Sequence, residues 1–279
     1  MQTSTCRLRP LAAIGDRLGR VARFAWSGWV GLAGLSVLAA IWQVGHETYG
    51  DFILPSPLAT LEATIAILGD PEAWDILAET AARAVVGFGL STLIGTGLGV
   101  AAGYSAASMR LARPLLTVVI GVPPIAWIVL AMIWFGSGDG TVVTTVLVAS
   151  TPLIFVGAAE GILTRDRGLD AMARAFGAGP VKRLMTLGLR HVAAHLLPAL
   201  VVSLGVAFKV AVMAELLANI GGIGSELAQA RANLDIATAL AWVLIAVGGL
   251  IAVEYGLVHP VRAELERWRT AAQPWGIKR

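Results

Sequence analysis

Long apolar runs separated by short charged connections make up almost the whole chain. Each run has roughly the 20 residues that an α-helix needs to cross the hydrocarbon core of a bilayer. The runs are continuously apolar, whereas barrel strands would alternate between apolar and polar positions. The pattern therefore predicts an all-α polytopic membrane protein with about six transmembrane helices. The predicted spans one to six cover residues 24–45, 84–109, 114–138, 140–159, 196–217 and 236–253.

The loop at 163–195, between spans four and five, is the main polar interruption. Leu169, Met172 and Phe176 recur at i, i+3 and i+7, and a second apolar set recurs within 181–189. This spacing predicts two short amphipathic helices on either side of a Gly-Ala-Gly-Pro break at 177–180. Such a structured loop suggests a docking surface for another protein. The six basic residues of the loop would also satisfy the positive-inside bias alone.

Charge predicts which side of the membrane each connection faces. Of the 21 Lys and Arg residues, 18 lie before span one, between spans two and three, between spans four and five, and after span six. The connection at 47–79 instead has seven acids and no base. Both termini are therefore expected in the cytoplasm, with a cytoplasmic segment at 1–23, a membrane domain at 24–260 and a cytoplasmic tail at 261–279. The net charge of +3 is an orientation signal and does not indicate a nucleic-acid partner.

The motifs of catalysis are absent from the sequence. Cys6 is the only cysteine, and no lysine follows a glycine as a phosphate-binding loop requires. No zinc-protease or nucleophile-elbow pattern occurs, and His191 and His195, four residues apart, are better explained as interfacial polar residues than as metal ligands. We expect a chain that is no enzyme and binds neither cofactor nor metal. A pump built on it needs an energy source on another subunit.

Span five carries two charged residues, which are functional candidates because burying charge in a membrane is costly. Lys209 lies about 12 Å from the predicted outer end, and about 240° around the helix from Glu215, so each needs a partner elsewhere. We hypothesise that Lys209 faces a translocation path and favours an anionic solute; a structural ion pair with another helix is the alternative. The double proline Pro123-Pro124 predicts a kink or a gate in span three.

Several segments, in this order and spacing, resemble the permease subunits of ATP-binding-cassette (ABC) importers for nitrate, sulfonates and taurine. The resemblance covers nearly the whole chain and implies that the 163–195 loop is the coupling loop that inserts into the ATPase. The segments are ILPSP at 53–57, PPIAWIVLAMIWFGSGDG at 123–140, Ala214-Glu215 followed by Gly222-Ile223-Gly224, and LERW at 265–268.

The family's coupling loop starts with an acid followed by two alanines, has a glycine six positions later and a Leu-Pro pair thirteen positions beyond it. Gly177 matches the glycine. Ala171 then stands at the acid position, with Asp170 one place early, and Leu189-Arg190 replaces Leu-Pro. The resemblance thus implies a divergent coupling loop. Its candidate residues are Asp170, Ala171, Ala173, Arg174, Gly177, Gly179, Leu189 and Arg190.

The resemblance also implies the assembly and the reaction. We expect a multi-pass protein of the bacterial inner membrane that forms a homodimer of permeases and works with an ABC ATPase subunit and an extracytoplasmic solute-binding protein. ATP would bind to the partner subunit, and the solute would be a small anion such as a sulfonate, taurine or nitrate, with a nitrogenous solute still open. Path and gate candidates are Pro123, Pro124, Lys209 and Glu215. The alternative is an ion-coupled carrier or channel that uses Lys209 and Glu215 as relay groups.

Overall fold

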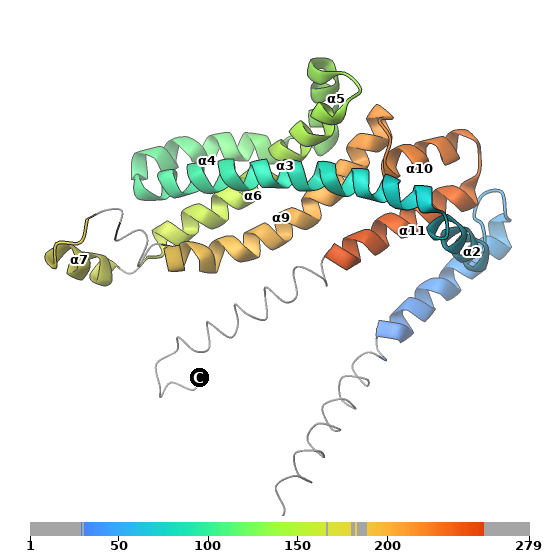
Figure 1. Ribbon diagram of the computed structural model, residues 1–279. Helices are drawn as coiled ribbons and strands as arrows, with labels where there is room; N and C mark the ends of the chain where they lie inside the picture. The colour runs from blue at the N-terminus through green and yellow to red at the C-terminus, as the bar shows by residue number, and fades with distance from the viewer. Residues whose placement is uncertain (1–28, 30, 166, 180–181, 183–188, 254–279) are drawn as a thin grey trace, which may run out of the picture. The chain divides into compact units, whose positions relative to one another are not determined.

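The computed structural model describes residues 29, 31–165, 167–179, 182 and 189–253, and the regular elements among them are helices (Figure 1). Four of these helices are long and apolar enough to cross a membrane, and a bent pair of helices makes a fifth candidate span. The all-α polytopic fold class is confirmed. The predicted first span begins outside the described residues. The four long helices are α3 (Pro71–Tyr104), α6 (Asp139–Leu163), α9 (Leu189–Ala218) and α11 (Ile236–Val253).

The described residues up to Glu62 form a compact part of their own. Residues 31–49 are helical, and Trp42 Nε1 donates a hydrogen bond to the carbonyl oxygen of Pro55 (2.9 Å). Helix α2 (Pro57–Leu68) follows, with the Ser56 hydroxyl accepting from the N–H of Ala59 (3.1 Å). A capping serine followed by proline is a strong helix start.

Helix α3 starts earlier than the apolar pattern predicts. The Asp70 side chain accepts a hydrogen bond from the N–H of Glu72 (3.1 Å), and Pro71 is the first helical residue. The acidic residues that follow therefore form the first turns of the helix. The predicted end of span two, at residue 109, is wrong: Ser105 is extended and caps the next helix, so α3 ends at Tyr104.

Glycines on one face of α3 allow close packing against α6. A Cβ atom at Gly87 would lie 2.7 Å from the side chain of Val146, and one at Gly103 would lie 2.6 Å from Ile162, whereas one at Gly97 would meet nothing within 4 Å. The register shows that the two helices run parallel, side by side in Figure 1. Small residues with this spacing allow helices to approach closely in lipid. The row facing α6 consists of Gly87, Ser91, Gly95, Gly99 and Gly103.

The double proline divides the predicted third span into two helices. Helix α4 (Ala106–Gly121) and helix α5 (Pro124–Phe135) are bent by 91°. Val122 is extended, as expected before proline, and Pro124 occupies the first position of α5, where its missing N–H has no intrahelical partner to lose. The predicted kink is confirmed and amounts to a complete break.

Helix α10 (Ile223–Ala232), between α9 and α11, was not predicted. It follows two glycines with positive φ, Gly221 and Gly222, and its ten residues are too few for a clear helical pattern. Helix α11 begins at the predicted residue, Ile236, and is helical to the last residue that the structure describes there, Val253. Asp235 caps it by accepting from the N–H of Thr238 (3.1 Å), and this hydrogen bond holds the pKa of Asp235 below its usual range.

Candidate functional site

Arg83, on α3, joins three helices at one end of the α3–α6 pair. Its Nε lies 2.7 Å from an Asp139 carboxylate oxygen at the start of α6, and one terminal nitrogen lies 2.9 Å from Glu215 on α9. The other terminal nitrogen lies 3.3 Å from Glu79, one turn earlier on α3. The Glu215 side chain is fully buried, whereas those of Glu79 and Asp139 are 56% and 71% exposed. One buried ion pair therefore lies beside two solvent-accessible carboxylates.

The buried pair is satisfied by further hydrogen bonds. Arg83 also donates to the backbone carbonyls of Ile220 (3.3 Å) and Gly221 (3.1 Å). The Glu215 carboxylate accepts from the Thr80 hydroxyl at 2.9 Å. The sequence argument that Glu215 needs a partner other than Lys209 is confirmed. Arg83 was missed as that partner, although it lies near the same predicted end of the membrane as Glu215 and few other bases do.

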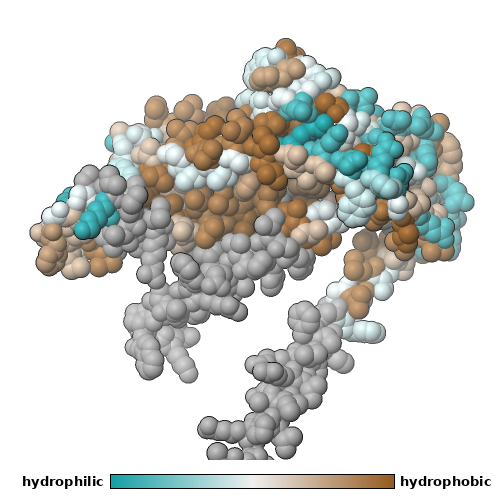
Figure 2. All heavy atoms as spheres, viewed as in Figure 1, coloured by the Kyte–Doolittle hydropathy of each residue, from teal (hydrophilic) through white to brown (hydrophobic). Residues whose placement is uncertain are grey.

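Hydrophilic side chains gather on this part of the molecule. Figure 2 shows them around α10 and the beginning of α3, beside a broad apolar band along α3 and α4. The band includes exposed Leu93, Leu111 and Leu115. An apolar band next to a polar end is the distribution expected of helices that contact lipid and then reach water.

Lys209 occupies a different face of α9. Its side chain is exposed, while the neighbouring Phe208 is buried. Within the described residues, no hydrogen bond or ion pair joins Lys209 to another helix. Its place on a translocation path stays a prediction, as do those of Pro123 and Pro124 at the break before α5.

Helix α7 (Arg167–Ala175) is the first of the two amphipathic helices predicted in the 163–195 loop, and it is confirmed. Asp170 and Arg174 form an ion pair of 2.9 Å along its polar side. The three apolar residues of the predicted face, which are Leu169, Met172 and Phe176, are 41%, 55% and 84% exposed. An apolar stripe on a helix normally lies against other elements, whereas these exposed fractions show that the described residues leave this one largely uncovered.

Gly177 ends α7 with a conformation that other residues rarely adopt. Its φ is +76°, its N–H donates to the carbonyl of Arg174 (2.9 Å), and the N–H of Ala178 donates to that of Ala173 (3.0 Å). These two hydrogen bonds form a Schellman motif, in which glycine avoids the clash between Cβ and backbone. The glycine that matches the coupling loop of the importers is therefore the stop signal of α7.

The remaining coupling-loop candidates are only partly described. Ala171 and Gly179 are exposed. Leu189 and Arg190 are the first described residues of α9, and their side chains lie outside the description. Most of the second predicted amphipathic helix, at 181–189, also lies outside it.

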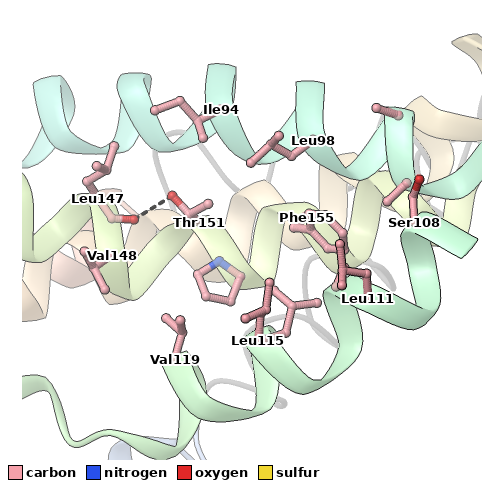
Figure 3. A pocket seen from close by; sticks show the side chains of 15 residues that line it. Ile94, Leu98, Ser108, Leu111, Leu115, Val119, Leu147, Val148, Thr151 and Phe155 are labelled. Carbon is pink, nitrogen blue, oxygen red and sulfur yellow. Dashed lines mark hydrogen bonds between the residues drawn. The ribbon is translucent and has the colours of Figure 1, made fainter.

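A groove of about 570 Å³ lies between α3, α4 and α6 (Figure 3). Its walls are almost entirely carbon, from residues such as Leu98, Leu115 and Phe155. The Thr151 hydroxyl is engaged with the carbonyl of Leu147 at 2.6 Å. The groove lacks converging polar groups for a charged solute. Among the described residues there is also no cluster of three His, Cys, Asp or Glu that could hold a metal ion.

A comparison with known families agrees with this arrangement of spans and with the amphipathic helix in the polar loop. The family model for the binding-protein-dependent transport system inner membrane component matches residues 94–257. The chain belongs to this family. It is an ABC transporter permease of the nitrate, sulfonate and taurine type, as the resemblance in the sequence implied.

Named relatives are similar over most of this permease. It is 26% identical over 225 residues to the taurine transport system permease protein TauC of Escherichia coli, covering 79% of this chain and 82% of that one. It is 26% identical over 262 residues to the putative aliphatic sulfonates transport permease protein SsuC of Bacillus subtilis, covering 93% of each. The bicarbonate transport system permease protein CmpB of Synechococcus elongatus is 24% identical over 197 residues, covering 66% of this chain and 70% of CmpB.

A solved structure supports the fold. A chain of the MetNI methionine ABC transporter in an inward-facing conformation superimposes with a TM-score of 0.57 at 19% identity, covering 66% of this permease and 92% of that chain. The two chains therefore have a similar three-dimensional arrangement of helices.

Proposed function

We propose that this permease forms the translocation path of an ATP-driven importer for a small anion and works by alternating access. The observation that carries the proposal is the open apolar face of α7, which stands in the loop that the family uses for coupling. A rigid helix that docks on an ATPase can convert closure of the ATPase into motion of the membrane helices.

Within this proposal, α7 is the coupling helix and faces the cytoplasm. The exposed side chains of Leu169, Met172 and Phe176 would enter an apolar groove on the ATPase, while the Asp170–Arg174 pair stabilises the helix. Gly177 sets the direction in which the chain leaves this contact. Ala173, Gly179, Leu189 and Arg190 would complete the docking surface.

The assembly would contain two copies of this chain in the inner membrane, two ATPase subunits and an extracytoplasmic solute-binding protein. Both termini would be cytoplasmic, as the distribution of Lys and Arg indicates. ATP would be bound and hydrolysed on the ATPase subunits. This chain would contribute the path and the coupling surface, with no catalytic residue and no nucleic-acid partner.

The names of the relatives support an anionic class of solute, since taurine, aliphatic sulfonates and bicarbonate each carry a negatively charged acid group. Lys209 would favour such a solute because it is a cation within a membrane-spanning helix. Replacing Lys209→Met should weaken the preference for anions, and Lys209→Arg should keep it. Full transport by Lys209→Met with an unchanged preference for anions would contradict this role.

The energy source separates the proposal from the ion-coupled alternative. The permease should co-purify with an ATPase subunit that has a phosphate-binding loop, and solute uptake should stop when that loop is inactivated. Uptake that continues without ATP hydrolysis and collapses with the proton gradient would favour a secondary carrier using Lys209 and Glu215.

A further inference from the structure

Helix α10 begins without a capping side chain of its own. Its N-cap residue is Gly222, and the first two helical residues, Ile223 and Gly224, have backbone N–H groups that need acceptors. Ile223 is 1% exposed, so water does not supply them. The N–H of Ile223 donates to the Thr80 hydroxyl (2.9 Å), and that of Gly224 donates to Glu215 (3.2 Å). The cap of α10 is therefore supplied by α3 and α9.

One turn of α3 holds this cap together. The Thr80 hydroxyl accepts from Ile223 and donates to Glu215, and Arg83 links Glu215 to the carbonyl of Gly221. Each group of the cap has a partner, so the loss of one would leave others buried and unsatisfied.

Backbone geometry makes this approach possible. Gly221 and Gly222 have φ values of +82° and +85°, which favour glycine. A Cβ atom at Gly222 would overlap the Glu215 carboxylate, and one at Gly224 would overlap the backbone of α9 at Val212. The glycines at 221, 222 and 224 therefore let the start of α10 reach the carboxylate.

We propose that Thr80, Arg83 and Glu215 are positioning residues that fix the start of α10 to α3. Helix α10 packs mainly on α9 and α11, whereas α3 is closely packed on α6 through its row of glycines. The hydrogen bonds of the cap thus connect α10 to the α3–α6 pair, and this polar connection is called the tie. Its importance for transport rests on the proposed function, while the tie itself can be measured without any solute.

Hydrogen–deuterium exchange of the full chain in lipid nanodiscs tests the tie. Thr80→Val keeps the size of the side chain and removes the hydroxyl. We expect exchange in peptides covering 219–228 to become about tenfold faster, as the loss of roughly 1.4 kcal/mol from a buried hydrogen-bonded group would give. Peptides from 88–104 and 145–163 should exchange at their native rates, and Thr80→Ser should restore protection.

Thr92→Val is the matched control. Thr92 lies on the same helix, and its hydroxyl donates only within α3, to the carbonyl of Phe88 at 2.8 Å. This variant should leave 219–228 protected. Native exchange at 219–228 in Thr80→Val, or equal loosening of all three regions, would overturn the proposal.

A second measurement separates the tie from the proposed function. ATP-dependent uptake of taurine, divided by the amount of assembled transporter, should fall in Thr80→Val and return in Thr80→Ser. Native uptake in Thr80→Val despite faster exchange would overturn the positioning role in transport. Failure of the native chain to take up taurine or any of the relatives' anions would count against the proposed function, and the exchange result would still decide the tie.

Discussion

The Arg83 cluster and helix α7 depart from the usual distribution of side chains in opposite ways. At Arg83, a charged pair is buried and each member has several partners. At α7, large apolar side chains are exposed, with Phe176 at 84%. Buried charge and exposed apolar surface are the two departures that require an explanation. The first is completed by residues of the same chain, whereas the proposed function assigns the second to a contact with another protein.

The two departures constrain the amino-acid sequence in different ways. The cluster needs an acid on α9, a base and a hydroxyl on α3, and glycines before α10, so its parts depend on one another. In the proposed function, the apolar face of α7 depends instead on the surface of the ATPase. Substitutions at the cluster should therefore change stability, and substitutions at α7 should change assembly.

The largest expected effect is on the buried pair. Glu215→Leu should lower the free energy of unfolding by about 3–5 kcal/mol, because it leaves Arg83 buried without its main partner. The double variant Glu215→Leu/Arg83→Met should recover part of this loss, since no charge is then stranded. Thermal unfolding of the purified permease in detergent measures both.

Glu79→Gln is the control for this experiment. Glu79 contacts the same guanidinium but is 56% exposed, so its removal should cost no more than about 1 kcal/mol. Equal losses at Glu79 and Glu215 would show that burial does not distinguish the partners of Arg83.

The second effect concerns the α3–α6 contact that supports the cluster. A Cβ atom at Gly95 would lie 2.9 Å from Ile154, whereas Gly97 has open space. Gly95→Val should therefore destabilise the fold by about 1–3 kcal/mol through overpacking. Gly97→Val should leave unfolding unchanged, and a similar loss in both variants would contradict the close packing of α3 on α6 through this row.

Hydrophobic pattern was enough to predict the class of fold, the start of α11 and the break at Pro123-Pro124. These features depend on local composition and on proline geometry, which a sequence displays directly. The early start of α3 and the existence of α10 were missed. In α3, the first turns are charged, so the apolar pattern does not mark the helix that Asp70 caps. In α10, one of the two capping groups is Thr80, which lies more than a hundred positions away along the chain.

The candidate sites show the same division. The α7 helix could be predicted from the sequence because its apolar spacing and its terminal glycine are local signals. The pairing of Arg83 with Glu215 depends on how α3 and α9 pack, and the sequence showed only that Glu215 lacked a partner within its own helix. Long-range pairs of this kind require the register between helices, which periodicity does not contain.

At α7, Phe176→Ser should reduce ATPase association at least about tenfold, as expected for loss of an aromatic anchor from an interface. Stability of the isolated permease should change by no more than about 0.5 kcal/mol, because the side chain is exposed. Leu234→Asn is the control, since Leu234 is a similarly exposed apolar residue in the turn before α11. Pull-down with the ATPase and thermal unfolding give the two readouts.

The smallest effect should come from Ala171→Glu, which places an acid where the importers' coupling loop has one. Ala171 is exposed, so the new carboxylate can reach a basic residue on the ATPase without a burial cost. A single exposed ion pair contributes about 0.2–1 kcal/mol, so association should strengthen by a few-fold at most. Ala232→Glu, which adds the same charge at the end of α10, should leave association unchanged. A complex that is unchanged or weaker in Ala171→Glu would mean that this coupling surface uses different contacts. The apolar face of α7 would then be the remaining surface expected to bind the ATPase.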